Sequence, residues 1–217
     1  MNKSADKKID SFFSKFKPLY YKKGEILIRP DESILGTFLL KKGLVRKYVI
    51  SPSGEELTVH VYRPITFFPT IFLIEKFSNH YFYEAISDVQ VNRAPANQII
   101  EFIKSEPEVL LELTRHFAQG LEGLTERIEE LTLEKTSERI INLIIYLSNQ
   151  YGSRVKNKII ILMPLTHKNI SDWLGMTRET TSRELEKLKS KDLISYNNKT
   201  LIVKNINKLK KEAEKYK

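Results

Sequence analysis

Residues 165–188 carry two helix-start signals with a glycine between them, and few folds accommodate that order. Thr166 precedes an amphipathic stretch with three apolar residues on one side, Ile170, Trp173 and Leu174. Gly175 permits a sharp turn, and Thr177 provides a second N-cap. A helix, a glycine-containing turn and a second helix within about 24 residues predict a helix-turn-helix, a motif whose second helix enters the major groove of DNA.

The second predicted helix, residues 177–188, has two different sides. At 100° per residue, four polar side chains fall within an arc of about 140°, namely Arg178, Glu179, Ser182 and Arg183. Thr181, Leu185 and Leu188 cluster on another side, so one face packs and the other is exposed. Arginine can bond O6 and N7 of guanine, and glutamate can accept from N4 of cytosine, so the exposed face suits base reading. Alternatively, Glu179 and Arg183 form an ordinary i,i+4 ion pair, which contributes roughly 0.2–0.5 kcal/mol.

This segment resembles the helix-turn-helix of the Crp/Fnr superfamily of bacterial transcription regulators. The matching pairs and triplets are Leu165-Thr166, Leu174-Gly175, Arg178-Glu179-Thr180 and Ser182-Arg183. The resemblance implies that Arg178, Glu179 and Arg183 contact bases. A supporting role, on the DNA backbone or behind the reading helix, is expected for Thr166, His167, Thr177, Thr180, Ser182, Lys187 and Lys199.

The net charge of +9 is confined to the C-terminal part of the chain. Residues 137–217 contain 17 Lys and Arg against 8 Asp and Glu, whereas residues 1–136 contain 19 of each. A basic domain attached to a neutral one predicts a polyanionic partner, because phosphate contacts with counterion release dominate non-specific DNA affinity. Double-stranded DNA is therefore the expected partner.

Several classes of protein are excluded by what the chain lacks. Without cysteine there is no disulfide, no thiolate metal site and no ordinary iron–sulfur cluster. The longest apolar stretches are too short to span a bilayer, and residues 1–16 lack the apolar core of a signal peptide. The four histidines are scattered and no catalytic motif is present. We therefore expect a cytoplasmic protein that is not an enzyme and holds no metal or cofactor.

Residues 18–95 alternate short apolar runs with turn signals, which predicts a small antiparallel β-barrel or β-roll. The expected strands are Glu25–Ile28, Thr37–Leu40, Leu44–Ile50, Leu57–Tyr62 and about Tyr81–Val91. A short amphipathic helix around Lys7–Phe16 precedes them. The stretch resembles the cyclic-nucleotide-binding β-roll of the same superfamily at Gly24, Gly43 and Gly54, although each glycine can equally be a plain turn residue.

The predicted effector pocket departs from the resemblance. Members that bind cyclic AMP hold its ribose and phosphate with a Gly-Glu pair and, a little further along, an Arg-Ser or Arg-Thr pair. This chain has no arginine between Arg63 and Arg93, so cyclic AMP is not the expected effector. The corresponding stretch contributes Phe67, Phe68, Thr70, His80 and Tyr81, which either line an apolar pocket or fill the core.

Apolar residues recur every three or four positions along a helix predicted within residues 97–135. The residues assigned to a dimer interface are Leu113, Phe117, Leu121, Leu124, Ile128 and Leu131. The spacing breaks a strict heptad near Phe117, so part of this seam is expected to face the barrel. In the superfamily the equivalent helix forms the dimer interface, and the resemblance therefore implies a homodimer. The polar stretch Thr132–Ser137 is the candidate hinge.

These features predict an α+β chain with three parts: a β-roll over 1–96, a dimerisation helix over 97–135 and a winged helix-turn-helix over 136–217, its wing formed by Leu193–Lys204. The resemblance implies a transcriptional regulator on an inverted-repeat operator with TGTGA-like half-sites. Arg178 and Arg183 would meet guanines there and Glu179 a cytosine, with RNA polymerase as a further partner. Alternatively, the β-roll is a degenerate interaction module and the helix-turn-helix docks a protein.

Overall fold

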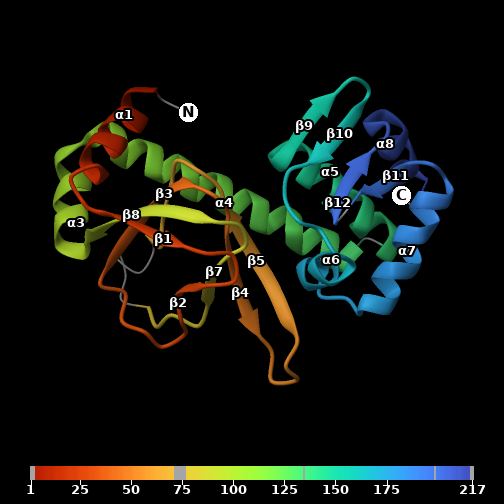
Figure 1. Cartoon of the computed structure of the whole chain (residues 1–217), viewed down its shortest axis with the longest axis horizontal. Helices are drawn as coiled ribbons and strands as arrows, with labels where there is room; N and C mark the ends of the chain where they lie inside the picture. Colours follow the sequence, from red (N-terminus) through yellow and green to blue (C-terminus); the bar gives the residue numbers. More distant parts are fainter. Residues whose placement is uncertain (1–2, 71–76, 134, 198, 216–217) are drawn as a thin grey trace. The chain divides into compact units, whose positions relative to one another are not determined.

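The computed structural model describes residues 3–70, 77–133, 135–197 and 199–215. Its contacts divide the chain into two compact units, Met1–Glu122 and Gly123–Lys217 (Figure 1). The boundary between the units falls inside one long helix, whereas the sequence predicts a separate dimerisation helix over 97–135. The three predicted domain ranges therefore remain a proposal about how the chain is organised.

The first unit is built around two antiparallel sheets of four strands each, ordered β1-β8-β3-β6 and β2-β7-β4-β5. Its elements are α1 (Lys3–Phe13), β1 (Pro18–Tyr21), β2 (Ile26–Ile28), β3 (Gly36–Lys42), β4 (Val45–Ile50), β5 (Glu56–Tyr62), β6 (Thr66–Phe68), β7 (Phe82–Ala85), β8 (Val89–Pro95), α3 (Ala96–Ser105) and the start of α4 (Pro107–Leu133). The predicted antiparallel β-roll is thus confirmed, and positive φ angles at Gly24, Gly43 and Gly54 match their reading as turn residues.

Neighbouring residues of β3 and β6 point into two different hydrophobic clusters, because side chains alternate across a strand. One cluster lies between the first sheet and the helices and contains Leu39, Phe67 and residues of α1, α3 and α4 (Figure 1). The other fills the space between the two sheets and contains Phe38, Leu40 and Phe68. The sheet β1-β8-β3-β6 is therefore covered on both faces.

The positions of Phe67 and Phe68 correct the predicted effector pocket. Phe67 packs towards the helices and Phe68 towards the interior of the roll, so the two rings do not line one cavity. Inside the roll, Phe68 stacks on Tyr62 at 4.5 Å and on Tyr83 at 5.7 Å between ring centroids. Aromatic side chains therefore fill this part of the core. Phe72, another aromatic of the same stretch, lies outside the described residues.

The strand expected over Tyr81–Val91 is two strands, β7 and β8, which belong to different sheets. The chain crosses between the sheets at a turn in which the Ser87 hydroxyl accepts a hydrogen bond from the backbone N–H of Leu44 at 2.9 Å. Gly43 lies beside this turn with φ of 90°, and a Cβ there would come within 2.3 Å of the Asp88 carbonyl oxygen. The polar pair Ser87-Asp88 was the sequence signal for this crossing.

The second unit is a helical bundle edged by a four-stranded sheet, ordered β11-β12-β10-β9. Its elements after α4 are α5 (Thr136–Tyr151), β9 (Gly152–Val155), β10 (Lys158–Ile161), α6 (His167–Leu174), α7 (Arg178–Ser190), β11 (Ile194–Asn197), β12 (Thr200–Val203) and α8 (Ile206–Glu214). The wing β11–β12 is confirmed. The hairpin β9–β10 and the C-terminal helix α8, which packs on α5 through buried Leu209 and Ala213, were not predicted.

The seam of α4 divides into a buried part and an exposed part. Leu113 is buried in the helix-side cluster of the first unit, so its assignment to the dimer interface is wrong. Further along, Phe117, Leu121, Leu124 and Ile128 are 41%, 67%, 56% and 64% exposed. The side chain of Leu131 lies outside the described part of the helix. Helix α4 ends at Leu133 and α5 begins at Thr136, within the predicted hinge.

Within the described part of the chain, every helix is too short or too polar to cross a lipid bilayer.

Replacing Phe68 with Ala should lower the free energy of unfolding of the first unit by about 3–5 kcal/mol, because a large ring is lost from a closed aromatic stack. Urea unfolding followed by circular dichroism measures this change. Trp173, the sole tryptophan, lies in the second unit, and its fluorescence transition should stay where it is. The control is Phe77→Ala, at a side chain 58% exposed, where a change within about 0.5 kcal/mol is expected. Equal effects of the two substitutions would contradict the packing described.

Candidate nucleic-acid interface

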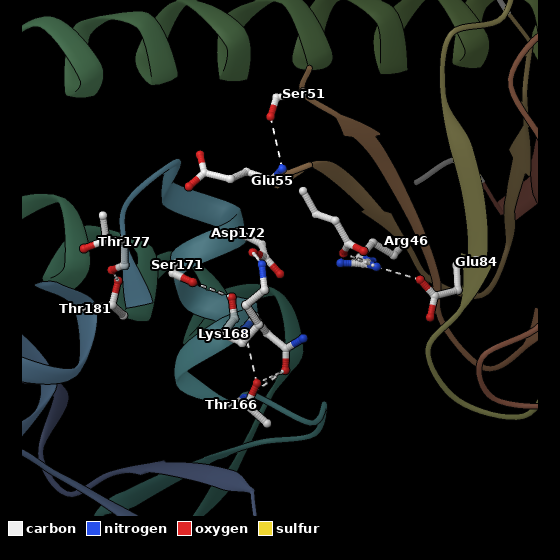
Figure 2. Close-up of polar contacts among 12 residues, drawn as sticks. Arg46, Ser51, Glu55, Glu84, Thr166, Lys168, Ser171, Asp172, Thr177 and Thr181 are labelled. Atoms are coloured by element: carbon white, nitrogen blue, oxygen red, sulfur yellow. Dashed lines mark hydrogen bonds and ion pairs between the residues drawn. The ribbon is translucent and has the colours of Figure 1, made fainter. Parts of the chain in front are cut away.

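Helix α6 is defined at both ends by its own side chains and backbone. Thr166 is the N-cap and forms a capping box with Asn169, whose backbone N–H donates to the Thr166 hydroxyl at 3.1 Å (Figure 2). The amide oxygen of Asn169 accepts from the Thr166 N–H at 2.9 Å. At the other end, Gly175 adopts the left-handed conformation, and its N–H bonds to the Ser171 carbonyl. The predicted cap and turn are both in place.

Three residues separate α7 from α6, and the first turn of α7 is also capped by a threonine. The Thr177 hydroxyl accepts from the backbone N–H of Thr180 at 3.2 Å. The hydroxyl of Thr181 donates to the Thr177 carbonyl at 3.1 Å, which holds the start of the helix from inside (Figure 2). Two capped helices joined by a glycine turn make a helix-turn-helix.

The two sides of α7 are as the sequence predicts. Thr181, Leu185 and Leu188 are buried, whereas Arg178, Glu179 and Arg183 are exposed. Among the described residues, Glu179 forms no ion pair with Arg183, whose nearest carboxylate is that of Glu184 at 3.8 Å. In the described structure these two residues therefore do not form the ordinary i,i+4 ion pair that was the alternative prediction. Both side chains remain open on the outer face.

A glutamate on the inner side of α7 is a feature that the sequence reasoning missed. Glu184 is buried, and its carboxylate accepts from the Ser137 hydroxyl at 2.6 Å and from the Lys187 ammonium at 2.7 Å. Burial alone would raise its pKa, but the two hydrogen bonds and the nearby charges of Lys187 and Arg183 outweigh it, so the pKa is lowered. The charged form is therefore the stable one, and it ties α7 to the first turn of α5. The signal in the sequence is that Glu184 falls on the same side of the helix as Thr181, Leu185 and Leu188.

Three of the expected supporting residues, Thr166, His167 and Lys199, lie where the starts of α6 and α7 meet the wing. His167 Nδ1 lies 2.8 Å from the Ser182 hydroxyl, and its ring lies 5.5 Å from that of Tyr196. A surface hollow of about 460 Å³ opens there, lined by Leu165, Thr166, His167, Lys168, Arg178, Tyr196 and Lys199. Three of these side chains are cationic, and Lys199 stands at the wing turn with φ of 67°. The other expected supporting residues, Thr177, Thr180, Ser182 and Lys187, do not line the hollow.

Two family models match the chain, and between them they cover most of it. Residues 18–106 match the cyclic nucleotide-binding domain, and residues 138–212 match the Crp-like helix-turn-helix domain. The first match lies within the first unit of the structure, and the second match lies within the second unit. The chain belongs to the Crp/Fnr superfamily of transcriptional regulators.

Named relatives agree with this assignment over nearly the whole length. The chain is 25% identical to the global nitrogen regulator of Nostoc sp. over 185 residues, which are 84% of this chain and 83% of that protein. It is 24% identical to the anaerobic regulatory protein of Haemophilus influenzae over 211 residues, 96% of this chain and 80% of that one. Both relatives are regulatory proteins.

Solved structures give the same result for the fold. A CRP/FNR-family transcriptional regulator from Thermus thermophilus superimposes with a TM-score of 0.76 at 25% identity, over 93% of this chain and 100% of that chain. The Crp/Fnr chain described here is accordingly a DNA-binding transcriptional regulator, and its DNA-binding element is the helix-turn-helix α6–α7.

Replacing Thr166 with Ala should lower the free energy of unfolding of the second unit by about 0.5–2 kcal/mol, because alanine lacks the hydroxyl that accepts from the Asn169 backbone N–H, although its own backbone N–H can still donate to the Asn169 side chain. Trp173 lies on the same helix, so urea unfolding followed by its fluorescence is the direct measurement. An unchanged midpoint would show that the box does not stabilise α6.

Proposed function

We propose that this regulator binds an inverted-repeat operator as a homodimer and reads bases with Arg178, Glu179 and Arg183. The observation that carries the proposal is the outer face of α7, where these three side chains are exposed while the opposite face is buried. Bidentate donors and a carboxylate at the N-terminal half of a recognition helix match the hydrogen-bonding groups of the major groove. The family resemblance supplies the expected half-site, TGTGA or a close variant.

Each base-reading residue has a distinct expected partner. Arg178 and Arg183 would bond O6 and N7 of guanines, and Glu179 would accept from N4 of a cytosine in a G·C pair. Glu184 supports this arrangement, because it fixes the inner side of α7 and lies 3.8 Å from the Arg183 guanidinium.

The DNA backbone is expected on the side of the hollow between α6, α7 and the wing. Lys168, Arg178 and Lys199 bring positive charge there, and the N-terminus of α6 adds the positive end of its helix dipole. The supporting role extends to Thr166, His167, Thr177, Thr180, Ser182 and Lys187. His167 and Ser182 bond to each other, so they join the two helices as well as flank the DNA.

Dimerisation is proposed through the exposed part of α4. Phe117, Leu121, Leu124 and Ile128 follow one another at steps of four, three and four, which places them on one side of the helix. An apolar stripe of this kind buries its surface against a second copy in a two-fold, self-complementary contact. We place Leu131 in the same interface from its spacing. The dimer would act in the cytoplasm with RNA polymerase as a further partner and without catalytic activity.

The effector is proposed to be a molecule other than cyclic AMP. No arginine occurs between Arg63 and Arg93, so the stretch that holds the cyclic phosphate in cyclic-AMP-binding members has no guanidinium to offer. Among the residues first expected there, Phe68 is core, His80 is exposed, and Thr70 and Tyr81 are half-buried. None of these groups carries a permanent positive charge.

Replacing Arg183 with Ala should weaken binding to an inverted repeat of TGTGA by about 1–3 kcal/mol, with half-site centres spaced about 10–10.5 base pairs apart. Binding to unrelated duplex should change much less, because only the base contact is lost. Mobility-shift titrations at one fixed salt concentration compare the two duplexes.

The matched control for this substitution is Lys189→Ala, on the last turn of α7, where the ammonium pairs with Glu186 at 3.3 Å. It removes one positive charge without a base contact and should affect both duplexes alike. If Arg183→Ala also weakened both duplexes alike, direct reading of bases by this residue would be refuted.

Replacing Leu124 with Glu should convert the dimer to monomer at micromolar protein, because it places two charges in the apolar stripe of the proposed two-fold interface. Sedimentation velocity measures the change. The control is Leu35→Glu, at a leucine 67% exposed outside α4, which should leave the dimer intact. A wild-type monomer, or a Leu124→Glu dimer as stable as the control, would contradict dimerisation through this helix.

A further inference from the structure

A hydrogen bond joins the first residue of α6 to the middle of the outer face of α7. His167 Nδ1 lies 2.8 Å from the Ser182 hydroxyl, and both side chains are half-buried. At 100° per residue, Ser182 falls between Arg178 and Glu179 around the helix. The hydroxyl beside the histidine therefore lies among the side chains that are proposed to contact bases.

The wing holds the imidazole ring of His167 in place. The centroid of this ring lies 5.5 Å from that of Tyr196, with 59° between the two ring planes. Both residues line the hollow of about 460 Å³ beside which the DNA backbone is expected. Nδ1 is engaged by Ser182, and Nε2 has no hydrogen-bond partner among the described residues. Nε2 is thus the ring nitrogen that remains for a phosphate.

The charged and titratable groups around the imidazole come from α6, α7 and the wing. They are Lys168 on α6, Arg178 and Glu186 on α7, and Tyr196 and Lys199 on the wing. Burial raises the pKa of Tyr196, so its hydroxyl stays neutral, and Glu186 is paired with Lys189 at 3.3 Å. The remaining groups are cations, which disfavour an imidazolium, whereas a DNA phosphate favours it. DNA binding is therefore expected to favour proton uptake by His167.

The hydrogen bond between His167 and Ser182 runs in opposite directions in the two charge states of the ring. A phosphate in the hollow accepts from Nε2–H in both states. In the neutral ring Nδ1 then carries no hydrogen, so the Ser182 hydroxyl donates to it and offers only lone pairs to the DNA. In the imidazolium the added proton is on Nδ1, which donates to the Ser182 oxygen. The Ser182 O–H is then free to donate outward.

We propose that His167 is a positioning residue whose protonation sets which bases Ser182 can bond. A donating hydroxyl suits guanine and thymine, because the hydrogen-bonding groups on their major-groove edges are all acceptors. An accepting hydroxyl suits the amino groups of adenine and cytosine. Histidine ordinarily changes charge between about pH 5 and 8, so base preference at one pair of each half-site changes across this range. This inference rests on the base reading proposed above and adds a fourth side chain to it.

Selection of operators from random duplexes by the full chain, at about pH 6 and about pH 8 and one ionic strength, tests the proposal. The wild type should enrich two inverted repeats that differ at one base pair of each half-site. Mobility-shift titrations of both should show their affinity ratio changing by about 2- to 10-fold between the two pH values, as one hydrogen bond can supply.

Two variants separate the charge of the ring from its effect on Ser182. Affinity of the wild type for unrelated duplex should fall as the pH rises, because the imidazolium charge is lost. Ser182→Ala should keep this fall but lose the change in base preference. His167→Gln, whose amide does not titrate, should lose both. The matched control is His80→Gln, at an exposed histidine of the first unit, which should behave like the wild type.

Fluorescence of Trp173, which lies on α6, establishes that the second unit of each variant is folded. If His167→Gln is unfolded, Ser182→Ala still tests the proposal. The same operator at both pH values, or a change in preference that persists in Ser182→Ala, would overturn this inference and leave base reading standing. Enrichment of no sequence at either pH would refute the proposed function and this inference with it.

Discussion

The burial of one side of α7 determines what the rest of the second unit can do. Thr181, Leu185 and Leu188 pack inward, and α7 contacts both α5 and α6. Successive residues of an α-helix are 100° apart around its axis. If a different side of α7 packed inward, Arg183 would no longer lie on the outer face. The hydrogen bond between Glu184 and Ser137 fixes the same orientation from the start of α5. The proposed base reading thus depends on the buried side of α7, because the packing of that side sets which side chains are exposed.

Features that depend on a few adjacent residues could be predicted from the sequence. Thr166, Gly175 and Thr177 act within one or two turns of their own helices, and each has its predicted place. The exposure of Arg178 and Arg183 also follows from local periodicity, since the apolar face of α7 alone decides it. Most strands of the β-roll were recognised for the same reason, with a turn glycine or proline at their ends.

Features that depend on distant parts of the chain could not be predicted. Phe67 and Phe68 read as one aromatic patch, but alternation along β6 sends them to opposite faces. Leu113 fits the spacing of the α4 seam, yet the helices of the first unit cover it. The crossing between β7 and β8 has a local signal in Ser87-Asp88, but which sheet each strand joins depends on distant strands. At the DNA-binding element, Glu184 is hydrogen-bonded to Ser137, which lies 47 residues earlier in the sequence, and no local pattern reveals this partner.

Positive charge is distributed unevenly along the chain. In the second unit it is plentiful and exposed on the outer face of α7 and around the hollow, as a polyanion requires. Residues 1–136 carry 19 basic and 19 acidic side chains, and Arg46 there is paired with Glu84 and Glu56.

Selection of operators from a pool of random duplexes by the full-length protein tests the central claim most directly. The account predicts enrichment of an inverted repeat with half-site centres about one helical turn apart and a G·C pair at the positions of Arg178, Glu179 and Arg183. The enriched sequence should change when Arg183 is replaced, and not when Lys189 is. Recovery of duplexes without any shared sequence would contradict the claim and would favour a helix-turn-helix that docks a protein.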